Sequence, residues 1–152
     1  MNRAWTFIIS KSLSRDELNS LTELGNNFVL GWTAHEKQLT ASFEIFKDKI
    51  IIVKVNEDVA GASGCSIDKL TRFVKDAETK FNIELLNRLL VAYKSGEEIE
   101  IVHSSKIKEL LEQNKISENT IIFNTASNNQ NELNNWEQEL KNTWLVKYLV
   151  KS

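Results

Sequence analysis

Apolar and polar residues follow two different periods in the first thirty positions of the chain. Residues 5–9 alternate in an almost wholly apolar run, which predicts a largely buried strand. Ser14 and Glu17 have the spacing of a capping box, and apolar residues then recur every three or four positions. We therefore expect a helix that ends at Gly31. Its apolar stripe comprises Leu18, Leu21, Leu24 and Phe28.

Period-two alternation predicts two hairpins farther along the chain. Residues 39–46 alternate apolar and polar side chains, and a tight turn at 47–49 leads into an apolar return strand. Residues 89–101 alternate in the same way around a turn at Ser95 and Gly96. The first hairpin is expected to have one polar face.

Helical spacing returns three more times. An apolar stripe predicts a second amphipathic helix that begins near Cys65. Ser105 is placed to cap a short helix, residues 120–123 are typical of a short strand, and Asn129 with Glu132 is expected to open a last helix. The residues expected on the core side of that last helix are Leu133, Trp136, Leu140 and Trp144.

This order of elements predicts an α+β fold. Tight hairpins imply mostly antiparallel pairing, and helices with a single apolar stripe suit packing on one face of a sheet. We expect a sheet of about five to six strands with about four helices. The first six elements have the βαββαβ order of a ferredoxin-like core, which leaves the remainder as a C-terminal extension. Without a linker or a repeat, residues 1–152 are expected to form a single domain.

Composition narrows the classes of partner. The chain has 19 basic and 21 acidic residues and a net charge of −2, so no overall field attracts nucleic acid or an anionic membrane. No apolar run approaches the ~20 residues of a membrane span, and the N-terminus lacks a secretory signal. We therefore expect a soluble cytoplasmic protein without a nucleic-acid partner or membrane insertion. With one cysteine and two histidines, neither a disulfide nor a recognised metal motif is expected.

Small residues before the second predicted helix mark the candidate site. The segment 61–68 reads GASGCSID, and small side chains let a ligand approach the backbone closely. Unpaired amides at the start of a helix favour an anion. We expect an anion-binding or small-molecule-binding module here, and no cofactor is implied. The candidate ligand-binding residues are Trp32, Thr33, Glu44, Ser63, Gly64, Ser66 and Asp68.

Two other classes of function stay open. In the first, Cys65 is the nucleophile of an enzyme, His35 is its base, and Asp68 or Glu44 orients the imidazole. Against it, free cysteine is usually buried. As an alternative to binding a ligand, Trp32 at the end of a helix usually completes a core. In the second class, the protein binds another protein without catalysis. A homodimer is then expected to form through Trp136, Leu140 and Trp144.

Several of these segments together resemble a known group of small bacterial proteins, some of which are labelled ABC transporter ATPase. The resemblance spans nearly the whole chain and implies no established activity. The segments that carry it are 32–35 (WTAH), 41–45 (ASFEI), 62–68 (ASGCSID), 81–82 (FN) and 87–88 (NR), with a weaker match at 120–124, Trp136 and Trp144.

The ATPase label conflicts with the residues. Nucleotide hydrolysis by a transporter subunit needs a glycine-rich loop that ends in Gly-Lys-Ser or Gly-Lys-Thr, so that amides and the lysine hold the phosphates. None of the 5 glycines is followed by lysine. We therefore expect no ATPase activity, while an accessory role beside a transporter stays open.

Overall fold

The computed structural model describes residues 2–57, 60–125 and 133–149. The first half contains β1 (Asn2–Ile8), α1 (Arg15–Leu30), β2 (Thr33–Ala34), β3 (Lys37–Gln38), β4 (Thr40–Phe46), β5 (Ile50–Asn56) and α2 (Gly64–Phe81). The second half contains β6 (Leu90–Ser95), β7 (Glu98–His103), η1 (Ser104–Lys106), α3 (Ile107–Glu112), β8 (Ile121–Phe123), β9 (Glu137–Glu139), η2 (Leu140–Asn142) and η3 (Trp144–Leu149).

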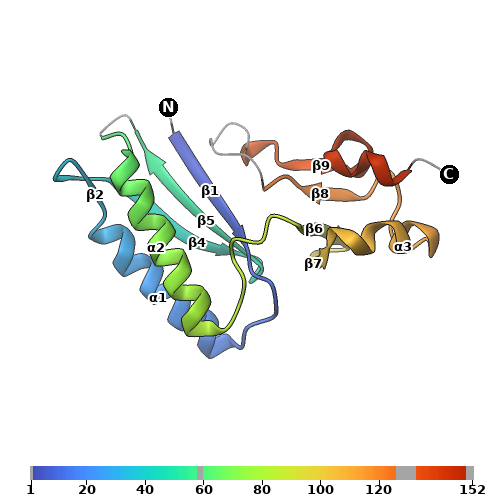
Figure 1. The fold of residues 1–152 in the computed structure, drawn as a ribbon, viewed down its shortest axis with the longest axis horizontal. Coiled ribbons are helices and arrows are strands. Elements are labelled where there is room, and N and C mark those ends of the chain that lie inside the picture. Colours follow the sequence, from blue (N-terminus) through green and yellow to red (C-terminus); the bar gives the residue numbers. More distant parts are fainter. Residues whose placement is uncertain (1, 58–59, 126–132, 150–152) are drawn as a thin grey trace.

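The α+β fold with antiparallel pairing is confirmed (Figure 1). One difference concerns how the strands are grouped. A three-stranded sheet has the order β1-β5-β4, and a four-stranded sheet has the order β7-β6-β8-β9. The short strands β2 and β3 form a hairpin of their own, which the sequence did not predict. The strands therefore divide among separate sheets instead of forming one continuous sheet.

The ferredoxin-like expectation applies to only part of the chain. The order β1-β5-β4 is the one expected for the first three strands of that core. The next strand, β6, does not join β1; it pairs with β7 and β8 because these strands offer it a partner on both edges. Side chains instead contact the free edge of β1. There, Thr6 Oγ1 donates a hydrogen bond to the carbonyl of Thr125 at 2.9 Å.

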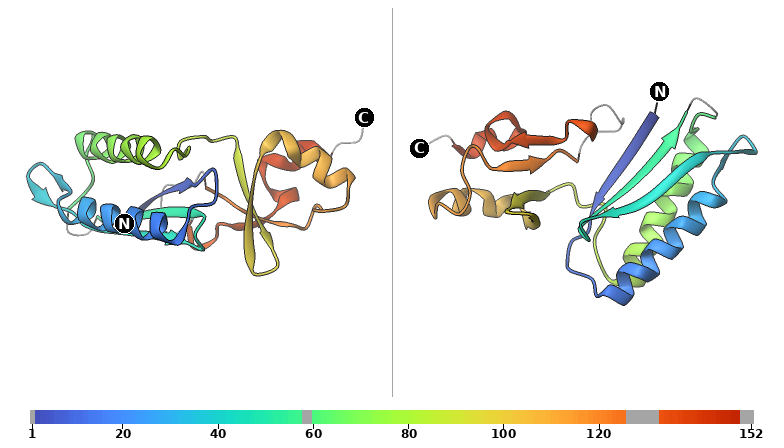
Figure 2. Two further views of the ribbon diagram at one scale, coloured as in Figure 1. Left: turned by 90° about the horizontal axis from the view of Figure 1, so that it is seen from below. Right: turned by 180° about the vertical axis from the view of Figure 1, so that it is seen from behind.

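Both long helices begin where the sequence predicts and cover the same face of the first sheet (Figures 1 and 2). The Ser14 hydroxyl accepts from the Glu17 amide at 3.1 Å, and the Glu17 carboxylate accepts from the Ser14 amide at 3.0 Å. Ser63 and Ser66 form the same reciprocal box at the start of α2. Each box satisfies amides that a helix otherwise leaves without a partner.

The central strand β5 is buried on both faces. Ile51, Val53 and Val55 pack with the helices, whereas Ile50 and Ile52 join a second cluster. That second cluster also contains apolar residues of the four-stranded sheet and of the segment before β9. A shared core thus connects the two sheets, and it explains why β5 reads as an unbroken apolar run.

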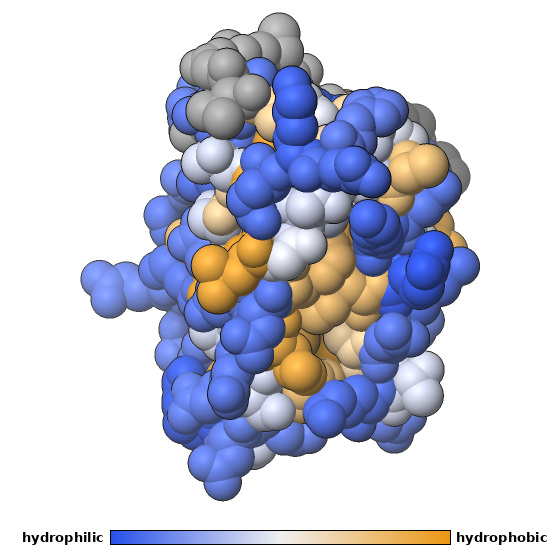
Figure 3. All heavy atoms as spheres, turned by 90° about the vertical axis from the view of Figure 1, so that its left-hand side faces the viewer, coloured by the Kyte–Doolittle hydropathy of each residue, from blue (hydrophilic) through white to orange (hydrophobic). Residues whose placement is uncertain are grey.

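Aromatic rings join the two long helices. Phe28 of α1 stacks on Phe73 of α2, with ring centroids 4.7 Å apart. On the side of the molecule that lies at the left of Figure 1, Figure 3 shows an apolar hollow bounded by polar side chains. None of the helices in the described ranges has the length and hydropathy needed to cross a membrane.

The expected last helix is confirmed only at Leu133 and Asn134 and is interrupted by a strand at residues 137–139. Asn129 and Glu132 lie outside the described residues. Residues 137–139 form β9, because β8 offers an open edge with which this segment pairs. Trp136 and Leu140 are buried but Trp144 is 51% exposed, so the three do not form one apolar face.

The short helix α3 also begins differently from the expectation. Ser105 does not cap it. Instead, the Ser105 amide donates to Nδ1 of His103 at 3.1 Å, which starts the preceding 3-10 turn η1. The helix then follows from Lys106 without a side-chain cap.

Candidate functional site

The structure brings two of the singled-out segments together at the start of α2. Trp32 is buried, with 1% of its surface exposed, and its Nε1 donates to the carbonyl of Ser66 at 2.8 Å. This bond joins the segment 32–35 to the segment 62–68. Trp32 therefore completes the core with its indole N–H satisfied.

Two amides of the loop before α2 are paired with side chains nearby in the sequence. The Ala62 amide donates to the Glu57 carboxylate at 3.0 Å, and the Ser63 amide donates to the Ser66 hydroxyl at 2.7 Å. Within the described residues, the amides of Gly64 and Cys65 have no acceptor. Two donors thus stay open at a helix N-terminus.

Cys65 and His35 are both exposed, but they form no hydrogen bond with one another. The exposure of Cys65 makes the alternative of a buried structural cysteine wrong. His35 lies in the turn between β2 and β3, with a φ of 51°. A nucleophile–base pair needs the two side chains within hydrogen-bond reach. The structure does not place them there.

The other predicted site residues are dispersed. Phe43 and Ile45 face the helices, so Glu44 between them lies on the opposite face of the sheet from α2. Its carboxylate is 3.6 Å from Lys54 Nζ. Asp68 is exposed on α2 and Thr33 is half-buried in β2. Glu44 is therefore separated by the sheet from α2, the helix whose first turn contains Cys65.

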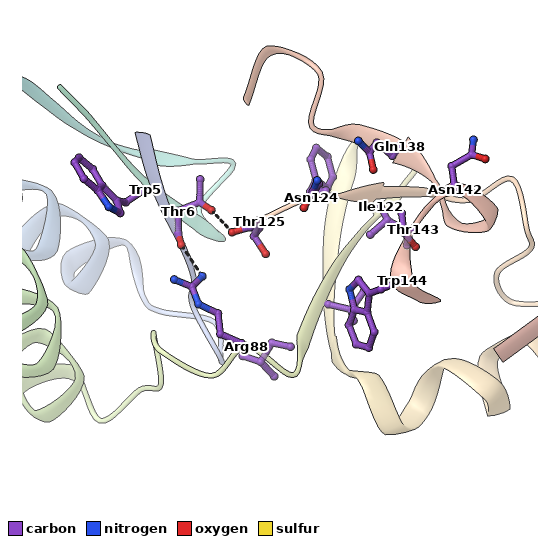
Figure 4. Close-up of a pocket in the computed structure, with 13 residues that line it drawn as sticks. Trp5, Thr6, Arg88, Ile122, Asn124, Thr125, Gln138, Asn142, Thr143 and Trp144 are labelled. Atoms are coloured by element: carbon purple, nitrogen blue, oxygen red, sulfur yellow. Dashed lines mark hydrogen bonds between the residues drawn. The ribbon is translucent and has the colours of Figure 1, made fainter. Parts of the chain in front are cut away.

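A cavity of about 620 Å³ lies elsewhere, where β1 meets the second sheet (Figure 4). Its volume falls in the ordinary range for small-molecule sites, about 300–1,000 Å³. The lining residues come from β1, from the chain around the start of β6, from β8 and β9, and from the C-terminal turns. They are Trp5, Thr6, Arg88, Leu90, Val91, Ile122, Phe123, Asn124, Thr125, Gln138, Asn142, Thr143 and Trp144.

Arg88 carries the only formal charge among these lining residues. Its Nη1 donates to the backbone carbonyl of Thr6 at 3.1 Å, and its guanidinium carbon is 5.7 Å from the ring centroid of Phe7. No carboxylate in the described part of the chain pairs with it. Among the described residues, the cavity therefore contains one positive charge with no counter-charge.

Trp144 lies across the cavity from Arg88 (Figure 4). Val91, Ile122 and Phe123 are buried apolar residues of the wall. The wall thus combines one cation, buried apolar side chains and an exposed aromatic ring. Such a combination is typical of sites that orient a small organic ligand.

Sequence reasoning missed these residues as a site. Arg88 was named only within the segment 87–88, which carries the resemblance to the bacterial group. Trp144 was expected on the core side of a helix. No local pattern indicates that β1, residue 88 and residue 144 meet, because the positions are far apart along the chain. Glu84 lies four positions before Arg88, so the charge pattern of the sequence favours a local ion pair and does not mark this arginine as unpartnered.

Within the described ranges, no group of three or more His, Cys, Asp or Glu side chains is placed to hold a metal ion.

Comparison of the chain with protein-family models, with curated proteins and with solved structures finds no match. The resemblance to the group of small bacterial proteins therefore stays a prediction.

Proposed function

We propose that this protein is a small-molecule-binding module that holds an organic anion in the cavity between β1 and the second sheet. One observation carries the proposal. Arg88 lines a cavity of suitable volume, is held by the Thr6 carbonyl, and has no carboxylate partner among the described residues. Arg88 is itself exposed, so a ligand can reach its guanidinium, whose planar fork of donors matches the geometry of a carboxylate.

The hydrogen bond to Thr6 supports a specific mode of binding. It uses Nη1 and limits the rotation of the guanidinium group. The edge formed by Nε and Nη2 has no acceptor in the described residues. A carboxylate accepts two parallel hydrogen bonds from such an edge. Arg88 is thus expected to act as the anchor of the ligand.

The loop before α2 is the second candidate location for the anion. The open amides of Gly64 and Cys65 favour it, as the sequence predicted. Catalysis by Cys65 stays a hypothesis for which the structure supplies no adjacent base. A bacterial source, a cytoplasmic location, a homodimer and an accessory role beside a transporter are likewise proposals that rest on the sequence alone.

The experiment measures anion binding by calorimetric titration with acetate, benzoate and inorganic phosphate. The protein is compared with Arg88→Gln and with Arg72→Gln, a matched control that removes an exposed arginine of α2 far from the cavity. We expect benzoate to bind the original protein and the control. Arg88→Gln should weaken it about tenfold or more, because charged hydrogen bonds are lost.

A third variant distinguishes the two locations. Gly64→Pro removes one open amide, and proline is well tolerated at the first position of a helix. Equal loss of affinity in Arg88→Gln and Arg72→Gln would overturn the role of Arg88. Loss only in Gly64→Pro would instead place the anion at the loop.

A further inference from the structure

We infer that the ligand is an aromatic carboxylate, with its carboxylate on Arg88 and its ring stacked on Trp144. This inference rests on the proposed function and extends it from the charge of the ligand to its chemical class. The two residues lie on opposite sides of the same cavity (Figure 4).

Trp144 differs from the other tryptophans of the chain. Trp32 and Trp136 are buried, at 1% and 8% exposure, and Trp5 makes an edge contact with Trp32 at 5.8 Å. Trp144 is 51% exposed and contacts no other aromatic ring of the described residues. Half of its surface is therefore open, although the Lys147 ammonium lies over the ring.

The backbone on either side of Trp144 is nevertheless held in place. Thr143 Oγ1 donates to the Leu140 carbonyl at 2.8 Å and accepts from the Leu145 amide at 3.2 Å. Leu145 itself is completely buried. Lys147 Nζ is 5.2 Å from the centroid of the Trp144 ring. Because its backbone neighbours are anchored, the ring can bind a ligand with little additional ordering cost.

The charge and polarity of the wall favour a carboxylate over a more highly charged group. Arg88 is the one charged group that lines the cavity in the described structure, and one guanidinium matches one carboxylate. The same wall contains the buried apolar side chains of Val91 and Ile122, which suit an apolar ligand body. Stacking of an aromatic ring on indole adds to this burial of apolar surface.

The test separates charge from aromaticity with three probes of similar size. Phenylacetate has both features, cyclohexylacetate keeps the carboxylate without the ring, and phenylacetamide keeps the ring without the charge. The dissociation constants are measured for the original protein, Arg88→Gln, Trp144→Leu and Trp144→Phe. We expect phenylacetate to bind about three- to tenfold more tightly than cyclohexylacetate, the range that an aromatic pair supplies.

Each variant is expected to change the dissociation constants of the three probes in a different way. Trp144→Leu should bring the two acids to equal affinity, while Trp144→Phe should retain most of the difference. Arg88→Gln should weaken both acids and leave phenylacetamide unchanged. Equal affinity of the two acids for the original protein would overturn the inference and leave the proposed function in place. Failure of both acids to bind would overturn the inference and count against the proposed function as well.

Discussion

The ring of Phe43 in β4 fills the space that a side chain at Gly25 of α1 would occupy. A Cβ at position 25 would overlap three carbons of that ring. The close approach lets α1 lie directly on β4, and the glycine is buried there. A helix-interior glycine, which ordinarily costs stability, is required here because the space beside it is already occupied.

Gly25→Ala is therefore expected to destabilise the protein, although alanine is the better helix former. The propensity gain is about 1 kcal/mol, whereas overpacking a core costs about 1–3 kcal/mol. Urea unfolding measures the net change in the free energy of unfolding. Gly31→Ala is the matched control, since a Cβ there meets nothing closer than the Asn27 carbonyl at 3.9 Å. If both substitutions had the same effect, the overlap with Phe43 would not be the cause.

Trp32→Phe tests the bond that connects the β2 segment to α2. The substitution keeps an aromatic ring but removes the donor to the Ser66 carbonyl. We expect a loss of about 1–3 kcal/mol in the free energy of unfolding, measured in urea. Trp5→Phe is the control, because Trp5 is only partly buried and its indole N–H has no acceptor in the described structure. A loss no larger than that of the control would contradict a structural role for the bond.

The capping box of α1 predicts a pH dependence. Hydrogen bonding to the backbone and then to the side chain of Ser14 lowers the pKa of the Glu17 carboxyl below its ordinary value. A carboxyl with a lowered folded-state pKa stabilises the fold above its unfolded pKa, and this contribution is lost as the pH falls through the folded value. Titration followed by NMR should show a lower pKa for Glu17 than for the same residue in unfolded protein.

Two variants check the origin of that shift. Ser14→Ala removes the side-chain contribution and keeps the backbone one, so the pKa of Glu17 should return only part of the way. Glu17→Gln should lose less stability on acidification than the original protein. An unchanged acid profile in Glu17→Gln would show that the box does not couple folding to pH.

The exposure of Cys65 predicts its behaviour toward thiol reagents. We expect iodoacetamide to modify the folded protein at a rate similar to that of the urea-unfolded protein, because the folded chain does not shield the thiol. Mass spectrometry at timed intervals measures both rates, and Cys65→Ser identifies the site. A folded-state rate far above the unfolded one, lost again in His35→Ala, would instead support the enzyme hypothesis.

Local sequence patterns determined most of the first half of the fold. The capping serines Ser14 and Ser63, the apolar stripes of α1 and α2 and the turn after β4 depend on residues close together in the chain. Helix capping and hydrophobic periodicity are local effects, so they can be read without knowing the tertiary contacts.

The C-terminal third and the cavity depended on contacts between distant residues. Residues 137–139 form a strand because β8 is available beside them, and β6 leaves the first sheet because β7 and β8 pair with it. Arg88 and Trp144 meet across one cavity only after both sheets have packed on their shared core. The sequence by itself thus determined which segments form the two main helices and hairpins. Tertiary structure alone decided where those segments pair and which charge stays unpaired, because strand pairing and burial depend on partners that lie far away in the chain.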